Sequence, residues 1–141
     1  MPTRSLSRWL ILLAVAFSLT CAAALASAAP PPHAGIHVLL TKNLPDIPGK
    51  QVLMLTLEYP PGRMPSPPHR HDADVFVYVL EGTFVTQVRG KKVETLHKGQ
   101  WFYEGPHDIH EVSANGSATK PLKLLIFMVK DRNKPATMPV K

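Results

Sequence analysis

GRMPSPPHRHDADVFVYVLEG, the stretch from Gly62 to Gly82, decides the fold. It joins a proline-rich approach, the histidine pair of a His-Arg-His triplet and the strongest strand candidate, 75–80. In an extended chain, residues two apart point to the same side. His69 and His71 can therefore present two imidazoles to one point, and imidazole binds zinc, copper, iron and nickel. A pair of surface histidines is the alternative that this spacing alone leaves open.

Short strand candidates separated by Gly, Pro and Asn turns fill the rest of the chain beyond residue 34, and no convincing helix is predicted after the first 28 residues. Besides 75–80, these candidates are 36–40, 51–59, 83–88, 93–96, 101–103, 109–114 and 122–129. Many short strands at such spacing predict an all-β sandwich or barrel. Trp101, Phe102, Leu125 and Phe127 are expected to pack in its core, not to line a substrate site.

His110 lies on a later strand candidate, just after the Gly105-Pro106 turn. A barrel can return that strand beside His69 and His71, where three histidines would form a metal site with open positions. Such a site needs further groups that fix each imidazole. Glu104 is the candidate for that role or for proton transfer. A solvated glutamate at a strand end is the alternative for this residue.

The remaining histidines are weaker ligand candidates, because they lie in turns, at strand ends or in the entry segment. They are His33, His37, His97 and His107. Of these, only His37 is ambiguous, and the others are expected to face solvent. Glu58 and Gln87 could line the same cavity as the histidines, with weaker claims than Glu104.

The N-terminus has the layout of a secretory signal peptide. Residues 1–8 carry two arginines and no acid, residues 9–19 are apolar, and small residues end in Ala26-Ser27-Ala28. The apolar run is shorter than the ~20 residues that a membrane-spanning helix needs. We therefore expect cleavage after Ala28 and a periplasmic or secreted protein. A retained membrane anchor and a lipoprotein modified at Cys21 are the alternatives.

Composition narrows the class of protein. The chain has 141 residues, 45% of them hydrophobic and 18% charged, which fits one folded domain. Loss of the signal peptide would lower the formal net charge from +6 to about +4 and remove the single cysteine, so neither a disulfide nor a cysteine zinc site is expected. The scattered Lys and Arg residues do not favour a nucleic-acid partner. No stable membrane anchor is expected after cleavage.

The predicted organisation has four parts. Residues 1–28 form the signal peptide, and residues 29–50 form a flexible Pro-rich entry with a short strand. The β-barrel occupies residues 51–130. Residues 131–141 form a C-terminal tail that is expected to fray.

Two motifs resemble those of the cupins. The stretch 62–82 looks like the first cupin motif, which consists of a glycine, H-x-H, a glutamate three or four residues on, and a second glycine. The second motif is matched by Gly99, His110 and Asn115. The resemblance covers roughly residues 51–129. It implies a single-domain cupin, that is, a double-stranded β-helix or jelly-roll barrel, with a three-histidine metal site.

The chain departs from both motifs. Val75 takes the position of the glutamate and cannot bind metal, while the adjacent Asp74 faces the other side of the strand. In the second motif, His107 stands where a glycine is expected and Gly105 where a proline is expected. The site therefore resembles that of three-histidine iron dioxygenases. Without an anionic ligand, a divalent ion would keep more positive charge and favour an anionic or enolate-type ligand.

The resemblance implies several classes of function. The first is a metal-dependent dioxygenase acting on a small organic molecule through Fe(II), with Zn, Mn, Ni or Cu as other candidate ions. The second is a non-catalytic module that binds metal or a small ligand, and the third is a cupin isomerase or sugar-modifying protein. Fold alone does not choose among them. A homodimer is also expected, because pairing covers exposed edge strands.

Overall fold

Two antiparallel β-sheets, joined by turns and loops, form the described structure, which is a computed structural model covering residues 35–62 and 65–140. The predicted signal peptide, together with Cys21 and His33, lies outside the described residues. The described ranges contain no helix with the length and hydropathy of a membrane span. The prediction of an all-β sandwich or barrel is confirmed, since the described strands form two antiparallel sheets.

Sheet A contains five strands in the order β1-β2-β9-β4-β7. Their bounds are Gly35–Asn43 (β1), Lys50–Tyr59 (β2), Ala73–Glu81 (β4), Trp101–Glu104 (β7) and Leu122–Asp131 (β9). In β4 the valines at 75, 77 and 79 are buried and the residues between them are exposed. This alternation is typical of a strand with one face on the core and one in solvent.

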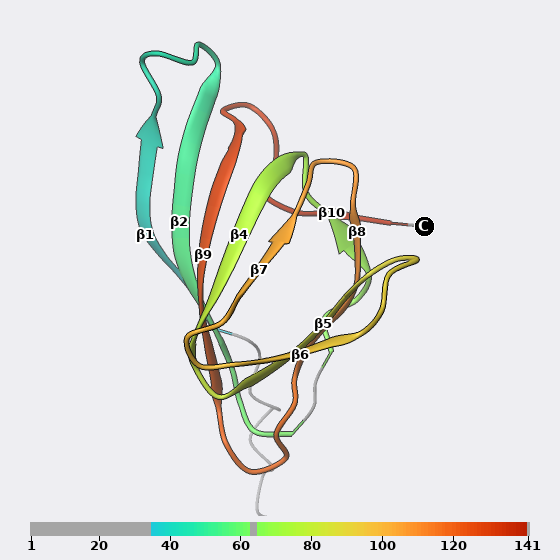
Figure 1. Cartoon of the computed structure of the whole chain (residues 1–141). Coiled ribbons are helices and arrows are strands. Elements are labelled where there is room, and N and C mark those ends of the chain that lie inside the picture. Colours follow the sequence, from blue (N-terminus) through green and yellow to red (C-terminus); the bar gives the residue numbers. More distant parts are fainter. Residues whose placement is uncertain (1–34, 63–64, 141) are drawn as a thin grey trace, which may run out of the picture. The chain divides into compact units, whose positions relative to one another are not determined.

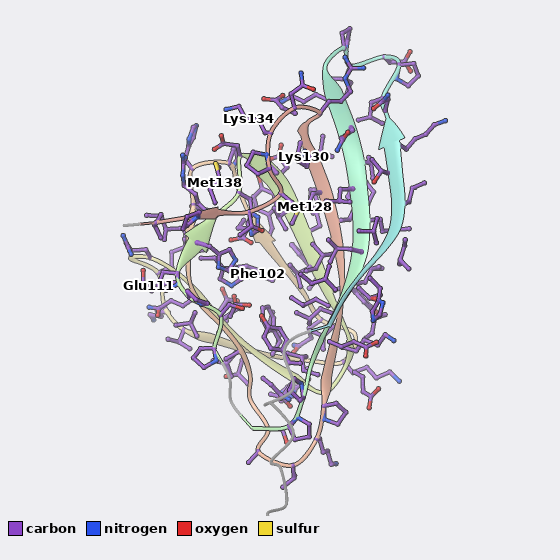
Figure 2. The ribbon with its side chains drawn as sticks, turned by 180° about the vertical axis from the view of Figure 1, so that it is seen from behind. Phe102, Glu111, Met128, Lys130, Lys134 and Met138 are labelled. Atoms are coloured by element: carbon purple, nitrogen blue, oxygen red, sulfur yellow. The ribbon has the colours of Figure 1, made fainter. Side chains whose placement is uncertain are left out.

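Sheet B faces sheet A and has the order β10-β3-β8-β5-β6 (Figure 1). Its strands are His69–Arg70 (β3), Thr83–Val88 (β5), Glu94–His97 (β6), Ile109–Asn115 (β8) and Met138–Pro139 (β10). The core fills the space between the sheets, where both Phe102 and Met128 are buried (Figure 2). Phe84 from sheet B meets Phe102 from sheet A edge to face, with ring centroids 6.3 Å apart.

Gly82 carries the chain from sheet A into sheet B between β4 and β5. Its φ is +86°, a conformation that side chains with a Cβ rarely adopt. A Cβ at this position would also lie 2.4 Å from the carbonyl oxygen of Pro121. The second glycine of the first motif is therefore needed both for the turn and for the close approach of a neighbouring loop.

All eight predicted strands are present, and two further short strands, β3 and β10, are not foreseen by the sequence pattern. The expectation of a frayed tail is wrong for its described part, since Met138 and Pro139 pair with β3. The prediction of core positions is wrong for Trp101 and Phe127, which are 68% and 37% exposed, and Leu125 is only half-buried. Phe102 is buried as expected, and neighbours on a strand must face opposite sides.

Candidate metal centre

Three histidines meet at the wall of the cavity between the sheets. Each of His69, His71 and His110 offers a ring nitrogen within 4.8 Å of those of the other two. His69 on β3 lies directly opposite His110 on β8 in the antiparallel register, and His71 follows β3 immediately. The ring of His69 lies 5.0 Å from each of the other two rings, centroid to centroid. The predicted clustering of the three side chains is confirmed.

Backbone carbonyls fix the orientation of two of these rings. His69 Nδ1 lies 2.8 Å from the Pro67 oxygen, and His71 Nδ1 lies 2.5 Å from the Ala136 oxygen. Because a carbonyl oxygen can only accept, both Nδ1 atoms carry the proton. The Nε2 atoms then hold free lone pairs, the form in which imidazole binds a metal. Burial lowers the pKa of His69, which also favours the neutral ring.

His110 is held from the other side. The hydroxyl of Thr86 on β5 lies 2.8 Å from His110 Nε2. Phe102 and Phe84 flank the ring, with centroids 5.4 Å and 6.2 Å from it. His110 is buried, so these contacts leave it little freedom to turn.

The proline-rich approach is tied to the same region through Tyr59 on β2. The Tyr59 hydroxyl lies 2.7 Å from Ser66 Oγ and 3.0 Å from Ser113 Oγ, and the Ser66 amide donates to the Ser113 oxygen. These bonds position Pro67, whose carbonyl holds His69. The prolines alone would stiffen this segment, but the Tyr59 contacts determine where it lies.

Glu104 faces the histidines rather than solvent. It is 1% exposed, and its Oε1 lies 3.4 Å from His71 Nε2 and 3.3 Å from His110 Nδ1. Within the described residues its Oε2 has no hydrogen-bond partner. Asp74, by contrast, faces outward and accepts a hydrogen bond from the Tyr103 hydroxyl. Glu104 is therefore the acid that reaches the cluster.

The histidine cluster opens on a cavity of about 620 Å³ between the two sheets. Side chains from sheet A make one apolar side of its wall, namely Ile36, Val38, Leu53, Leu55, Leu57, Val75, Val77, Leu124, Ile126 and Met128. Glu104 is the one acidic side chain among the lining residues. The cavity thus has an apolar wall with polar groups gathered at the cluster, as in small-molecule sites generally.

The weaker candidates for metal ligands and cavity-lining residues lie outside the site. His37, His97 and His107 are exposed, as is expected of residues outside the cluster. Glu58 pairs with Lys123 at 2.6 Å, and this partner lowers the Glu58 pKa. The amide of Gln87 donates to a backbone carbonyl in the adjacent turn. Neither Glu58 nor Gln87 lines the cavity.

Sequence reasoning missed the groups that orient the ligands. Thr86 could have been found from the alternation of β5, which predicts that it faces inward. Nothing in the sequence indicates that the Ala136 carbonyl reaches His71, because that contact joins residues 65 positions apart.

Asn115 matches the second motif, and its side-chain amide donates hydrogen bonds to the Pro60 and Lys120 oxygens. It therefore holds two loops in place and does not act as a ligand.

The donor set suits a divalent transition metal. Three imidazoles fit zinc, copper, iron and nickel, and a nearby carboxylate extends the range towards manganese. The carbonyl and hydroxyl contacts to the outer ring nitrogens are those that metal-binding histidines require. The residues present therefore fit a bound ion.

Comparison with solved structures supports the fold. An uncharacterised protein from Klebsiella pneumoniae with a double-stranded β-helix domain is 17% identical, with a TM-score of 0.60 over 80% of this chain and 90% of that one. A DMSP lyase from Ruegeria pomeroyi is 17% identical, with a TM-score of 0.54 over 63% of this chain and 43% of the lyase. Oxalate oxidase with bound glycolate is 18% identical, with a TM-score of 0.57 over 79% and 57% of the two chains.

These identities show a shared fold and nothing finer. This chain spans less than half the length of the DMSP lyase. No match was found among curated proteins. The family model of the cupin domain matches residues 55–128, more than half of the chain and the part that contains all three histidines, so the chain belongs to the cupin family.

Proposed function

We propose that this cupin is a metal-dependent enzyme acting on a small, largely apolar organic molecule that carries an oxygen donor. The observation that carries the proposal is the opening of the histidine cluster onto an aliphatic cavity. His69, His71 and His110 would hold a divalent ion, with Fe(II) as the first expectation. A substrate would place its apolar body against sheet A and its oxygen at the ion.

A divalent ion at this site supplies Lewis acidity and, when it is Fe(II), reactivity towards O2, which makes dioxygenase chemistry the leading reaction class. The chain's own residues bind and orient the reactants. The aliphatic wall excludes water and selects apolar substituents, while the fixed imidazoles keep the polar end in one place. Glu104 stands beside two of the rings, which supports the predicted participation of its carboxylate at the site.

The second candidate is a non-catalytic module that binds metal or a small ligand, and the same cluster and cavity favour it. A sugar-modifying activity is less well supported, because sugar hydroxyls need many hydrogen-bond partners. Apart from the cluster and Glu104, the polar side chains of the described wall are Tyr59, Ser66, Ser113 and Thr137. Tyr59 already bonds both serines.

Oxygen uptake by iron-loaded protein tests the proposal. The purified chain is loaded with Fe(II) without air and then mixed with β-diketones or flavonols in an oxygen electrode. We expect iron-dependent O2 consumption that His69→Ala plus His71→Ala abolishes and His107→Ala, an exposed histidine outside the cluster, leaves unchanged. Bound metal without any O2 consumption would favour the binding module, and failure to bind metal would overturn both.

We also propose export, which rests on the layout of residues 1–28. Expression of the full chain in a Gram-negative host should yield periplasmic or secreted protein that begins at Ala29. N-terminal sequencing of that fraction checks the cleavage site. Full-length protein retained in the membrane would instead support an anchor.

A homodimer is the proposed assembly. Strand β1 forms one edge of sheet A and exposes the apolar side chains of Ile36, Val38, Leu39 and Leu40. An exposed apolar edge favours pairing with a second copy. Light scattering after gel filtration should give twice the mass of one mature chain, and a monomer mass would contradict the proposal.

A further inference from the structure

Glu104 is a buried carboxylate that has neither a lysine nor an arginine partner among the described residues. It is 1% exposed, and the ion-pair partners that the described structure gives it are two histidines, not a lysine or an arginine. Its Oε2 is buried without a hydrogen-bond partner among the described residues. An ionised carboxylate in such a place is strongly destabilising unless a positive charge balances it or a proton neutralises it. The fold therefore brings an acid to the cluster and leaves part of its bonding capacity free.

The contact with His71 needs a proton or a metal ion between its two atoms. Since His71 Nδ1 donates to the Ala136 oxygen, the neutral ring presents the lone pair of Nε2 to Glu104 Oε1, 3.4 Å away. Two electron-rich atoms facing each other repel. A metal ion bound by both atoms turns that repulsion into two favourable bonds.

The distances agree with ligands that share an ion. Metal–nitrogen and metal–oxygen bonds are roughly 2.0–2.2 Å, so neighbouring ligands of one ion stand roughly 3.0–3.4 Å apart. Glu104 Oε1 lies 3.4 Å from His71 Nε2 and 3.3 Å from His110 Nδ1. Both separations exceed the usual range of an N–H···O hydrogen bond, roughly 2.7–3.2 Å.

The strand register explains how the acid arrives. Glu104 on β7 is the direct antiparallel partner of Val75 on β4. Directly opposed residues point to the same face, with Cβ atoms roughly 4.5–5.5 Å apart. Both residues line the cavity. The carboxylate of Glu104 on β7 therefore lies beside Val75, the residue that takes the position of the motif glutamate.

We propose that Glu104 is a direct, anionic ligand of the metal ion, completing the set formed by His69, His71 and His110. The proposal rests on the proposed function, because it requires the ion that the histidines would hold. It replaces the expectation of a site without an anionic protein ligand. One carboxylate reduces the net charge of a divalent site by one, so the site would accept neutral or singly charged oxygen donors, and not only strongly anionic ones.

Binding of Co²⁺ to the full chain tests the assignment without any activity measurement. Titrations followed by visible absorption compare the wild type, Glu104→Gln, His69→Ala plus His71→Ala, and the surface control Glu58→Gln. We expect Glu104→Gln to weaken Co²⁺ binding by about tenfold to a hundredfold or more and to change the absorption bands. Loss of a residue that only orients a metal ligand already lowers metal affinity by about that factor. Glu58→Gln should match the wild type.

A rescue variant separates ligation from support of the fold. Val75→Glu combined with Glu104→Gln moves the carboxylate to the opposite residue of the strand pair, and we expect it to recover much of the lost affinity. An unchanged Co²⁺ affinity and spectrum in Glu104→Gln, with binding lost in the double histidine variant, would overturn the Glu104 assignment alone. Binding kept in the double histidine variant would overturn the proposed metal site itself.

A crystal structure of the wild-type chain loaded with Co²⁺ keeps the assignment testable if the variants do not fold. A Glu104 oxygen at roughly 2.0–2.2 Å from the ion is expected. An ion bound by the histidines with both Glu104 oxygens beyond about 3 Å would overturn it.

Discussion

The two sheets contribute differently to the cavity that they enclose. Sheet B and the segments that flank it supply His69, His71 and His110, and each of these rings is held by a polar contact. Sheet A supplies a wall of aliphatic side chains in which Glu104 is the one charged residue. Glu104 comes from β7, the edge strand of sheet A opposite β1.

The difference teaches that, apart from Glu104, the polar groups of the site and the apolar packing surface come from separate layers. Polar groups in one layer can be fixed by short bonds to loops and to the tail, while the other layer presents a mainly apolar surface. A substrate would then be oriented by chemistry on one side and selected by shape on the other. Changes to the aliphatic side chains of sheet A should therefore alter stability, whereas changes to the histidines of sheet B and its flanking segments, or to Glu104 at the edge of sheet A, should alter metal binding.

The largest expected effect breaks the packing of sheet A. Leu122 on β9 is fully buried and does not line the cavity, so Leu122→Ala should lower the free energy of unfolding by about 2–5 kcal/mol. Urea unfolding measures this loss. Co²⁺ affinity of the folded protein should stay unchanged, and Trp101→Ala on the exposed face of the sheet should cost less than about 0.5 kcal/mol. Weaker metal binding at unchanged stability would contradict the division between the sheets.

The second-largest loss of stability is expected at Gly82, where the chain crosses from sheet A to sheet B. Gly82→Ala should destabilise the fold by about 1–3 kcal/mol or more, because it combines a positive φ with the close approach of the Pro121 oxygen. Gly90→Ala is the matched control, since Gly90 has a φ of +81° and nothing within 4 Å of an added Cβ. Thermal unfolding of both variants isolates the steric part. Equal losses would mean that the contact with Pro121 contributes nothing.

A smaller effect concerns the orientation of a ligand in sheet B. Thr86→Val keeps the shape of the side chain and removes the hydroxyl that lies beside His110 Nε2. We expect Co²⁺ affinity to fall by roughly tenfold, with a stability loss of only about 0.5–1.5 kcal/mol. Thr83→Val, near the exposed His97, is the control. Wild-type affinity in Thr86→Val would show that this hydroxyl does not orient the ring.

The smallest effect lies on the outside of sheet A, at the cross-strand pair of Glu58 and Lys123. Hydrogen bonding to Lys123 and its charge hold the pKa of Glu58 below its ordinary value of 4.5. A depressed carboxyl pKa stabilises the fold above the unfolded value and loses that contribution as the pH falls through the folded value. The stability difference between the wild type and Lys123→Gln should therefore be small at pH 7 and vanish in acid. A difference that grows below pH 4 would contradict this sign.

The sequence pattern predicts most of the fold and the identity of the clustered histidines. Alternation in β4 and the two motifs carry that prediction, because they depend on local spacing. The pairing of the tail and the roles of Thr86 and Ala136 escape it, and for Glu104 it leaves a place at the site and a place in solvent both open. These features depend on the strand register and on contacts between distant segments, such as Val75 with Glu104 and His71 with Ala136. Local spacing carries no information about either.

Metal content of the purified protein tests the central claim most directly. The wild type and a triple variant with alanine at His69, His71 and His110 are supplied with Fe(II), Mn²⁺ or Zn²⁺, desalted and analysed for metal per chain. The account predicts about one tightly held ion per wild-type chain for at least one of these metals and none in the triple variant. A wild-type chain that retains no ion, or a triple variant that retains one, would contradict it.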